Sequence, residues 1–202
     1  MSKGLLIVIS GPSGAGKGTI CKELLKNNPN INLSVSATTR APRQGEEHGI
    51  NYFFKEKSEF LEMMDNNQFL EHAEVYGNYY GTPKDFAMEK IEKGEDILLE
   101  IDIQGALQVK KNYPDGVFIF ILPPSLEELK KRIIGRGSET EESLYRRYGA
   151  AKAEIEYAFK YHYGVVNDEV EEATAKVEAI LKAERCKISR IERLIKSIEE
   201  EK

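Results

Sequence analysis

The feature that most constrains this chain is a glycine-rich segment, residues 11–19, which follows an apolar run and precedes a helical pattern. It reads Gly-Pro-Ser-Gly-Ala-Gly-Lys-Gly-Thr and satisfies the pattern GxxxxGK at Gly11, Gly16 and Lys17. Glycines let backbone N–H groups curl around phosphate oxygens without a Cβ in the way. The positive end of the following helix and the Lys17 ammonium act on the same anion. The segment therefore predicts a nucleotide-binding phosphate loop, whereas a glycine pattern alone would often be only a turn.

One position of this loop departs from its commonest form. Gly18 stands where GK[ST] supplies a hydroxyl ligand for magnesium, and the hydroxyl comes one residue later, at Thr19. Magnesium keeps several of its waters in most protein sites. The sequence therefore does not identify a protein ligand for the metal. We expect Thr19 to donate to a phosphate, while phosphates and water hold Mg²⁺.

Four short apolar runs are typical of parallel strands that are covered on both faces. They span residues 5–9, 97–99, 117–122 and 165–166 and lack the strict alternation of half-exposed strands. Helical patterns lie between them, for example at residues 18–26 and 125–134. The order predicts βαβ units and a doubly wound α/β core in a single domain.

The connection between the first helix and the second apolar run is too long for a simple crossover. We expect core segments at about residues 1–35, 91–125 and 158–202, an inserted subdomain at about 36–90, and a lid at about 126–157. The insert contains a helical pattern at residues 58–66 and turn-forming residues at 77–83. A charged helix is expected from about residue 171 to 202, with Ile188, Ile191, Ile195 and Ile198 as a seam for the body or a second subunit.

Composition excludes several classes of protein. An apolar fraction of 41% and a charged fraction of 31% are those of a folded globular chain. The net charge of −5 gives no general excess of positive charge for nucleic acid, and no apolar stretch approaches the roughly 20 residues that span a membrane. We expect a cytoplasmic protein. Cys21 and Cys186 are expected to be packing residues, and the three histidines lack metal-ligand spacing.

Motifs along nearly the whole chain resemble guanylate kinase. They are the phosphate loop, residues 36–43, 49–52, Glu71, 77–82, 100–105, 135–137, 146–147 and 166–168. The resemblance implies an α/β, P-loop NTPase-like parallel sheet flanked by helices, with an inserted GMP-binding subdomain and a helical lid. It also implies transfer of the γ-phosphoryl group of ATP to GMP, and to dGMP, with Mg²⁺, in purine nucleotide metabolism.

The residue types of the insert fit an acceptor of this kind. Arg40 and Arg43 give fork-shaped donors for a dianionic phosphate, and Tyr52 and Tyr80 add hydroxyl donors. Guanine presents N1–H and a 2-amino group beside the O6 acceptor, so its reader needs a carboxylate and a hydroxyl.

By resemblance, Glu71 reads the N1 and N2 edge of guanine, and Ser36 and Thr82 lie near O6 or N2. Asp102 reads the base edge or orients the phosphate-binding arginines. Thr82 stands where serine is frequent in the family, and Glu100, a further substrate-binding residue, where aspartate is frequent.

The resemblance also gives the donor side. The catalytic set is Lys17, Arg40, Arg136 and Arg147, and Arg132 and Arg146 are further candidates at the donor phosphates. The donor-binding set is Gly11, Pro12, Ser13, Gly14, Ala15, Gly16, Lys17, Gly18 and Thr19, with Asn167 at the adenine.

Two rival interpretations predict different chemistry. A catalytically inactive interaction module of the same fold should have a degraded phosphate loop, whereas Lys17 and the glycines are intact. A kinase for AMP or a pyrimidine monophosphate would have no use for Glu71 and Asp102 as guanine readers. The expected partners are the small molecules GMP and ATP, without nucleic acid or membrane, and the oligomeric state stays open between monomer and homodimer.

Overall fold

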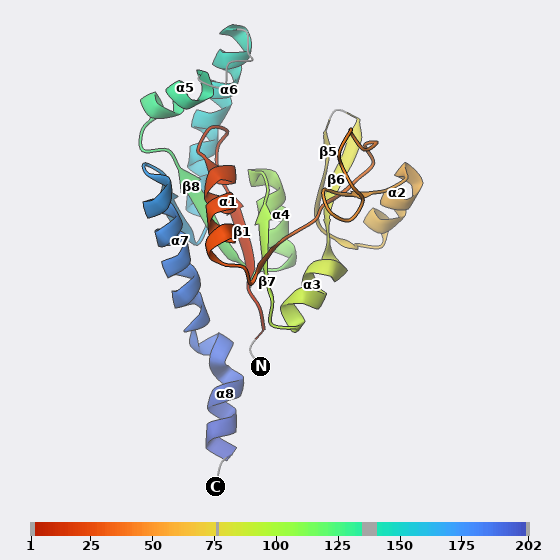
Figure 1. The fold of residues 1–202 in the computed structure, drawn as a ribbon, viewed down its shortest axis with the longest axis vertical. Helices are drawn as coiled ribbons and strands as arrows, with labels where there is room; N and C mark the ends of the chain where they lie inside the picture. The colour runs from red at the N-terminus through yellow and green to blue at the C-terminus, as the bar shows by residue number, and fades with distance from the viewer. Residues whose placement is uncertain (1–2, 76, 135–140, 201–202) are drawn as a thin grey trace.

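The computed structural model describes residues 3–75, 77–134 and 141–200, without the side chains of 141–147 and 193. A five-stranded, all-parallel sheet forms the core, in the order β2-β7-β1-β8-β9. A second, four-stranded sheet of order β4-β3-β6-β5 forms a separate lobe (Figure 1). The predicted α/β architecture with a parallel sheet and flanking helices is thus confirmed.

The core lobe is built of parallel strands connected by helices, as the predicted βαβ units require. Its elements are β1 (Leu6–Ser10), α1 (Lys17–Asn27), β2 (Ile31–Leu33), α3 (Lys84–Glu92), β7 (Asp96–Glu100), α4 (Ile103–Asn112), β8 (Val117–Leu122), β9 (Tyr163–Val166), α7 (Val170–Arg185) and α8 (Ile188–Glu200).

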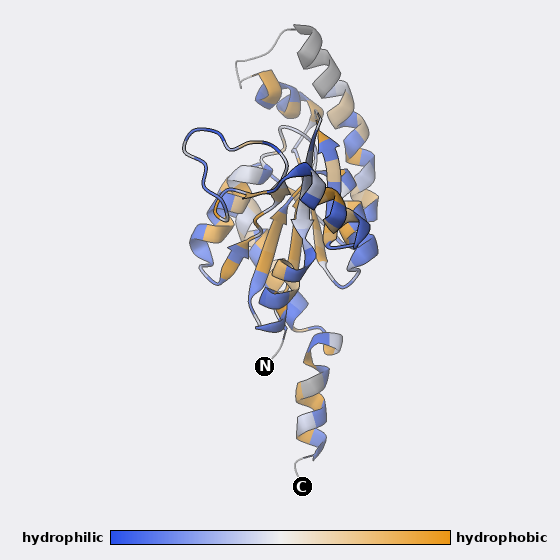
Figure 2. Ribbon diagram, turned by 90° about the vertical axis from the view of Figure 1, so that its right-hand side faces the viewer, coloured by the Kyte–Doolittle hydropathy of each residue, from blue (hydrophilic) through white to orange (hydrophobic). Residues whose placement is uncertain are grey.

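Alternate residues of each central strand pack on opposite faces of this sheet. Leu5, Ile7 and Ile9 belong to the cluster under α1 and α7, whereas Leu6 and Val8 belong to the cluster under α3 and α4. Both faces are therefore dry, which explains why these strands are continuously apolar (Figure 2). The buried β1 carries the phosphate loop at its C-terminal end.

The second lobe extends from β3 to β6, within the segment of about residues 36–90 for which we expect an insert, and α3, at the end of that segment, packs on the core. It contains β3 (Ala37–Thr38), β4 (Phe53–Phe54), α2 (Lys57–Asp65), β5 (Phe69–Val75) and β6 (Asn78–Pro83). Its small core is built on Phe60, whose ring stacks on Phe69 at 4.4 Å and on Tyr79 at 5.6 Å between centroids.

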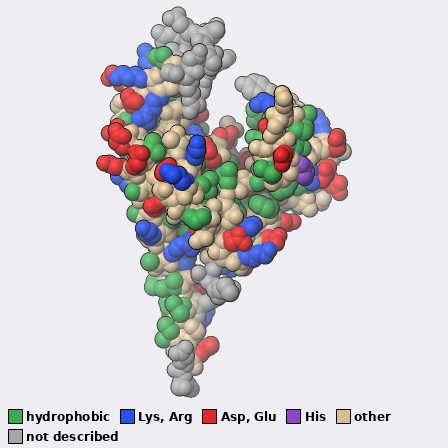
Figure 3. Space-filling view, in the orientation of Figure 1, with side chains coloured by type: hydrophobic (Ala, Val, Ile, Leu, Met, Phe, Trp, Pro, Cys, Tyr) green, Lys and Arg blue, Asp and Glu red, His purple; other side chains and the backbone are tan. Residues whose placement is uncertain are grey.

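A third part is formed by α5 (Leu126–Ile134), α6 (Glu141–Ile155) and a 3-10 helix (Glu156–Lys160). Leu129 and Ile133 of α5 pack on Ala151 of α6 in a cluster of their own. Figure 3 shows a hollow between this part and the inserted lobe. No helix among the described residues is long and apolar enough to cross a membrane.

Several local predictions were wrong. Residues 78–83, expected as turns, form β6, because their pairing with β5 satisfies the backbone. The segment expected to form a single C-terminal helix forms two, α7 and α8, with the break at Cys186. Cys186, expected to be a packing residue, is exposed. Val166 is also exposed, since β9 is an edge strand. The strand β2 was not predicted, because it has only three residues.

The C-terminal helix α8 extends beyond the body (Figure 1). Within the expected seam, Ile188 and Ile198 are exposed and Ile191 and Ile195 are half-buried. The seam therefore does not dock along the core, and docking on a second subunit stays a prediction.

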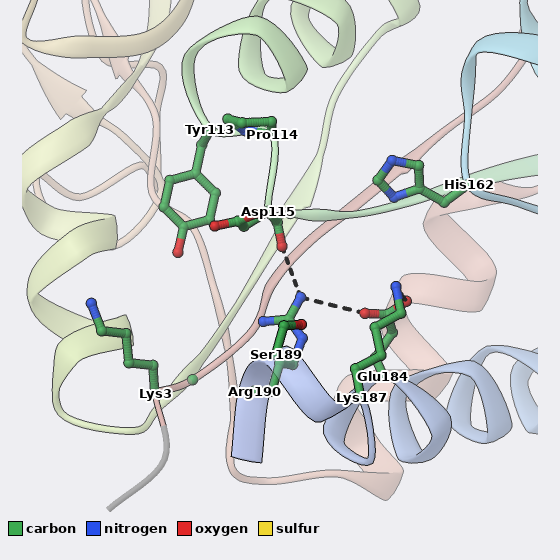
Figure 4. Close-up of a pocket in the computed structure, with 11 residues that line it drawn as sticks. Lys3, Tyr113, Pro114, Asp115, His162, Glu184, Lys187, Ser189 and Arg190 are labelled. Atoms are coloured by element: carbon green, nitrogen blue, oxygen red, sulfur yellow. Dashed lines mark hydrogen bonds and ion pairs between the residues drawn. The ribbon is translucent and has the colours of Figure 1, made fainter. Parts of the chain in front are cut away.

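A network of charges fastens the start of α8 to the base of the sheet. It borders a cavity of about 430 Å³ at the opposite end of the strands from the phosphate loop (Figure 4). Arg190 donates to the backbone oxygen of Asp115 at 2.7 Å and pairs with Glu184, whose buried carboxylate also binds Lys187 at 2.6 Å. Lys187 and Arg190 thus share the Glu184 carboxylate, and these contacts beside the cavity anchor the start of α8.

Asp96 joins three elements at the same end of the sheet. Its side chain is 4% exposed, and its Oδ1 accepts from the backbone nitrogen of Leu5 at 2.8 Å. Its other oxygen binds Arg185 at the end of α7. The carboxylate thus connects β7, the residue before β1, and α7.

We predict that Asp96→Ala lowers the free energy of unfolding by about 2–4 kcal/mol, because it leaves the buried Leu5 N–H without an acceptor. Asp96→Asn keeps an oxygen for that N–H and should lose less. Urea unfolding followed by circular dichroism measures both. Equal losses in the two variants would contradict a dominant role for the Leu5 hydrogen bond.

Candidate functional site

The phosphate loop connects β1 to α1 and turns on glycines with positive φ. Gly11, Gly14 and Gly16 have φ of 148°, 89° and 88°, a region that side-chain-bearing residues rarely adopt. The Lys17 ammonium donates to the backbone oxygens of Gly11 at 2.7 Å and Pro12 at 3.1 Å, so it lies across the loop. The loop conformation and the lysine position agree with the phosphate-binding prediction.

Asn167, which follows β9, contacts the phosphate loop through a buried hydrogen bond. Its side-chain amide is 2% exposed and donates to the backbone oxygen of Ala15 at 2.8 Å. A Cβ on Gly16 would lie 2.2 Å from the Asn167 nitrogen, so this close approach requires glycine. The contact locks the loop to the last strand of the sheet.

Arg132 of α5 lies on the same side of the loop. Its guanidinium donates to the backbone oxygen of Asn167 at 2.9 Å and pairs with Glu128 at 2.9 Å. A cavity of about 340 Å³ lies here, lined by Gly14, Gly16, Thr19, Arg132, Asn167, Asp168 and Val170. This arrangement places a cation at the edge of a pocket beside the loop.

The C-terminal end of β7 brings two carboxylates toward the phosphate loop. A Cβ on Gly18 would lie 3.3 Å from Glu100 Oε1, so the missing side chain at position 18 makes room for this carboxylate. Asp102 caps α4 by accepting from the backbone nitrogen of Gly105 at 2.7 Å. Both carboxylates line a cavity of about 320 Å³ together with Gly11, Ser13 and Lys17.

In the inserted lobe, Arg40 is held by three groups. It pairs with Glu46 at 2.9 Å, donates to the backbone oxygen of Ala41 at 2.7 Å, and lies 5.5 Å from the centre of the Tyr52 ring. Tyr80 packs edge-on against Tyr52 at 6.1 Å. The hydrogen bond with Glu46 raises the pKa of Arg40 and lowers that of Glu46, so both groups are charged.

Glu71 is a buried carboxylate at the junction of the inserted lobe and the core. It lies opposite Thr82 across β5 and β6, next to an irregularity in the register, and Thr82 Oγ1 donates to its Oε1 at 2.6 Å. A Cβ on Gly105 would lie 3.0 Å from Glu71 Oε2, so the carboxylate approaches the N-terminus of α4. Burial raises the pKa of Glu71, and Asp102 adds to the effect, while the Thr82 hydrogen bond opposes it.

Two amide side chains of α4 fix β5 against the core. Gln108 exchanges hydrogen bonds with the backbone of His72 at 3.1 Å, and Asn112 donates to the backbone oxygen of Leu70 at 2.8 Å. These contacts fix β5, and with it Glu71, against α4. The N-terminus of the same helix is capped by Asp102.

Two cavities share one wall. The cavity next to Lys17 and a cavity of about 180 Å³ lined by Ser36, Tyr52 and Thr82 both include Glu100 and Ile101. A ligand on the phosphate loop and a ligand in the inserted lobe would thus meet at the C-terminal end of β7.

The structure brings together most of the residues predicted for the site. Arg43 is different, because its side chain is exposed and its backbone nitrogen donates to Glu46 at 2.7 Å. Arg136 lies outside the described residues, and Arg146 and Arg147 lie in α6 where side chains are not described.

Two residues near the site were missed by the sequence analysis. Glu46 holds Arg40, and its place three residues after Arg43 in a turn was the available signal. Glu154 of α6 accepts from the backbone nitrogen of Ser13 at 3.4 Å. Nothing in the sequence indicated this contact, because 141 residues separate the partners.

Within the described part of the chain, no group of three or more histidine, cysteine, aspartate or glutamate side chains could hold a metal ion. Cys21 lies buried on α1, and burial raises the pKa of its thiol, with the nearby Glu100 adding to the effect. The thiol is therefore protonated and acts in packing, as predicted.

Comparison with known proteins gives a consistent result. A family model described as guanylate kinase matches residues 3–184. The guanylate kinase of Clostridium tetani is 62% identical over 191 residues, which is 95% of this chain and 91% of that protein. That of Clostridium perfringens strain SM101 is 61% identical over 99% of this chain and 93% of its own. The crystal structure of guanylate kinase from Anaplasma phagocytophilum is similar with a TM-score of 0.74 and 37% identity, covering 98% of this chain and 96% of the other.

The buried Glu71 generates a prediction on stability. A carboxyl group whose pKa is raised by folding favours the folded state at low pH, and this contribution is lost as the pH rises through the folded pKa. Glu71→Gln stays neutral and keeps an oxygen for the Thr82 hydroxyl. We expect it to match the wild type near pH 4 and to exceed it in free energy of unfolding at pH 7.

Urea unfolding at several pH values measures this difference. Glu74→Gln, on the same strand but exposed, is the matched control and should change little at either pH. A Glu71→Gln variant less stable than the wild type at pH 7 would mean that the charged hydrogen bond outweighs burial.

Proposed function

The chain belongs to the guanylate kinase family, and we propose from the geometry of its site how its residues perform that family's reaction, transfer of the γ-phosphoryl group of ATP to GMP. The observation that carries the proposal is the wall formed by Glu100 and Ile101, which a loop-side and an insert-side cavity share. Phosphoryl transfer needs donor and acceptor held in line, with charge stabilisation at the transferred group. A common wall between two substrate pockets provides such a meeting point.

On the donor side, we propose that residues 11–19 bind the phosphates of ATP. Backbone N–H groups of the loop and of the first turn of α1 would donate to phosphate oxygens, and Lys17 would move its ammonium from loop carbonyl oxygens to the β- and γ-phosphates. Asn167 and Arg132 border the pocket on the far side of the loop, where the adenosine part would lie. Arg136 and Arg147 keep their predicted roles at the donor phosphates.

On the acceptor side, we propose that Arg40, with Arg43, Tyr52 and Tyr80, binds the phosphate of GMP. The contacts of Arg40 with Glu46 and Ala41 hold its guanidinium in place before the ligand arrives, which reduces the entropy lost on binding. Glu71 would accept from guanine N1–H and the 2-amino group, with Ser36 and Thr82 near O6 or N2. The Thr82 hydroxyl fixes one oxygen of that carboxylate.

We propose that Mg²⁺ accompanies ATP. When bound, the ion neutralises charge shared between the β- and γ-phosphates. The donor set fits this hard cation, because Glu100 supplies carboxylate oxygen beside Gly18, where the commoner loop has a hydroxyl. Glu100 would hold metal-bound water, and Thr19 would donate to a phosphate.

We further propose a single-domain enzyme with a core, an insert and a lid, in which α3 belongs to the core, acting on GMP, dGMP and ATP in the cytoplasm. Closure of the lid over both substrates would exclude water that hydrolyses ATP. The proposal includes neither a nucleic acid nor a membrane as partner.

The acceptor assignment predicts strong selectivity. In an assay that couples ADP formation to NADH oxidation, turnover should depend on GMP or dGMP. AMP, CMP and UMP should react at least about a thousandfold less efficiently, because none of their bases presents the adjacent N1–H and 2-amino donors with which guanine would pair the Glu71 carboxylate. Comparable kcat/KM values for AMP and GMP would overturn the guanine assignment.

The two arginines of the insert should differ in their contributions. Arg40→Ala removes a preorganised, charged donor, and should raise the KM for GMP about tenfold or more while leaving the KM for ATP nearly unchanged. Arg43→Ala, with an exposed side chain, is the matched comparison and should raise it less. Steady-state kinetics with each substrate varied in turn measures these effects; a larger effect of Arg43→Ala would contradict the ranking.

A further inference from the structure

A glutamate of the lid lies in the pocket of the phosphate loop. Glu154 belongs to the last turn of α6, and its Oε2 accepts from the backbone nitrogen of Ser13 at 3.4 Å. The same side chain lines the cavity that contains Gly11 and Lys17. The contact joins two segments separated by 141 residues.

The Glu154 carboxylate offers the phosphate loop the same kind of acceptor as a nucleotide phosphate does. Backbone N–H groups of a phosphate loop are donors for anionic oxygens, and a carboxylate offers two such oxygens. Among the residues that the structure describes, the charged groups lining the cavity are the Lys17 ammonium and the carboxylates of Glu100, Asp102 and Glu154. Glu100 and Asp102 lie at and just after the C-terminal end of β7, whereas Glu154 comes from the lid.

We propose that Glu154 occupies the place of a nucleotide phosphate oxygen on the loop in the free protein and must leave Ser13 when ATP or ADP binds. This inference rests on the proposed binding of the donor phosphates by residues 11–19. A phosphate and the Glu154 carboxylate repel each other and need the same donor, so they exclude each other at this position. Glu154 thereby lowers the affinity of the free protein for the donor nucleotide.

The contact also links the nucleotide to the position of the lid. Ala151, one turn before Glu154 on α6, packs against Leu129 and Ile133 of α5. The Glu154 contact therefore connects the phosphate loop to the end of α6 that also supports α5. Displacement of Glu154 by a nucleotide phosphate would remove this one contact between the lid and the loop.

Calorimetric titration with ADP tests this role without turnover. We expect ADP to bind Glu154→Gln and Glu154→Ala about two- to fivefold more tightly than the wild type, both with EDTA and with Mg²⁺, since a partly exposed charge contact is lost. Glu156→Gln is the matched control, because Glu156 is exposed and lies just after α6. It should bind ADP like the wild type. Circular dichroism establishes that each variant is folded.

Other outcomes overturn the inference in distinguishable ways. Unchanged or weaker binding by both Glu154 variants, with normal binding by the wild type, would show that Glu154 does not compete with the nucleotide. Weakening only in the presence of Mg²⁺ would make Glu154 a metal ligand instead. Failure of the wild type itself to bind ADP would instead refute the proposed donor site.

A spectroscopic measurement on the free protein gives an independent test. In nitrogen-edited NMR spectra at neutral pH, the Ser13 amide signal should move when Glu154 is changed to Gln, because its acceptor changes from a carboxylate to an amide. Glu156→Gln should leave that signal in place. A Ser13 amide at the same position in Glu154→Gln and in the wild type would contradict the contact.

Discussion

The position of β1 between β7 and β8 is the constraint from which the site follows. Parallel pairing aligns Ile9 with Glu100 and Ser10 with Phe120, so these strands end at the same edge of the sheet. Both faces of β1 are buried, and a slip by one residue would turn each apolar side chain toward the wrong layer. The burial of five strand residues thereby fixes where the phosphate loop begins and which carboxylate of β7 lies beside it.

The charges of the site are arranged around this edge in two different ways. Arg40 and Glu46 form an ion pair on the inserted lobe, where the carboxylate and the Tyr52 ring hold the guanidinium in place. Next to the phosphate loop, the described residues that line the cavity with Lys17 include the carboxylates of Glu100, Asp102 and Glu154. These carboxylates are consistent with the proposals that Mg²⁺ accompanies the donor nucleotide and that Glu154 is displaced when it binds.

Specificity and stability make opposite demands on Glu71. Burial between the inserted lobe and α4 raises its pKa and disfavours the charge, yet the role proposed for Glu71, pairing with the two donors of a guanine edge, requires a carboxylate. The Thr82 hydroxyl partly offsets the penalty by donating to one oxygen. The remaining cost is tolerable because Gln108 and Asn112 of α4 hold β5 in place independently of this side chain.

The sequence by itself determined the phosphate loop, the central strands and the family, because each is written in short-range patterns. Glycine positions, continuous apolar runs and a lysine before a helix reflect local steric and solvation demands. The inserted sheet was not visible, since β3 and β4 have two residues each and are stabilised only by their neighbours. The break of the C-terminal helix at Cys186 was hidden for a similar reason, because the anchor of α8 is made by Arg190 with Asp115, far away in the chain.

Only the tertiary structure decided how the candidate residues meet. The register irregularity between Phe69 and Glu71 sets which face of β5 carries the carboxylate, and no local pattern encodes its approach to Gly105. Glu100 became the shared wall of two cavities because β7 ends beside both the loop and the insert. Glu154 reached Ser13 only because the fold brings the end of α6 beside the phosphate loop, and such contacts between distant residues depend on packing rather than on sequence periodicity.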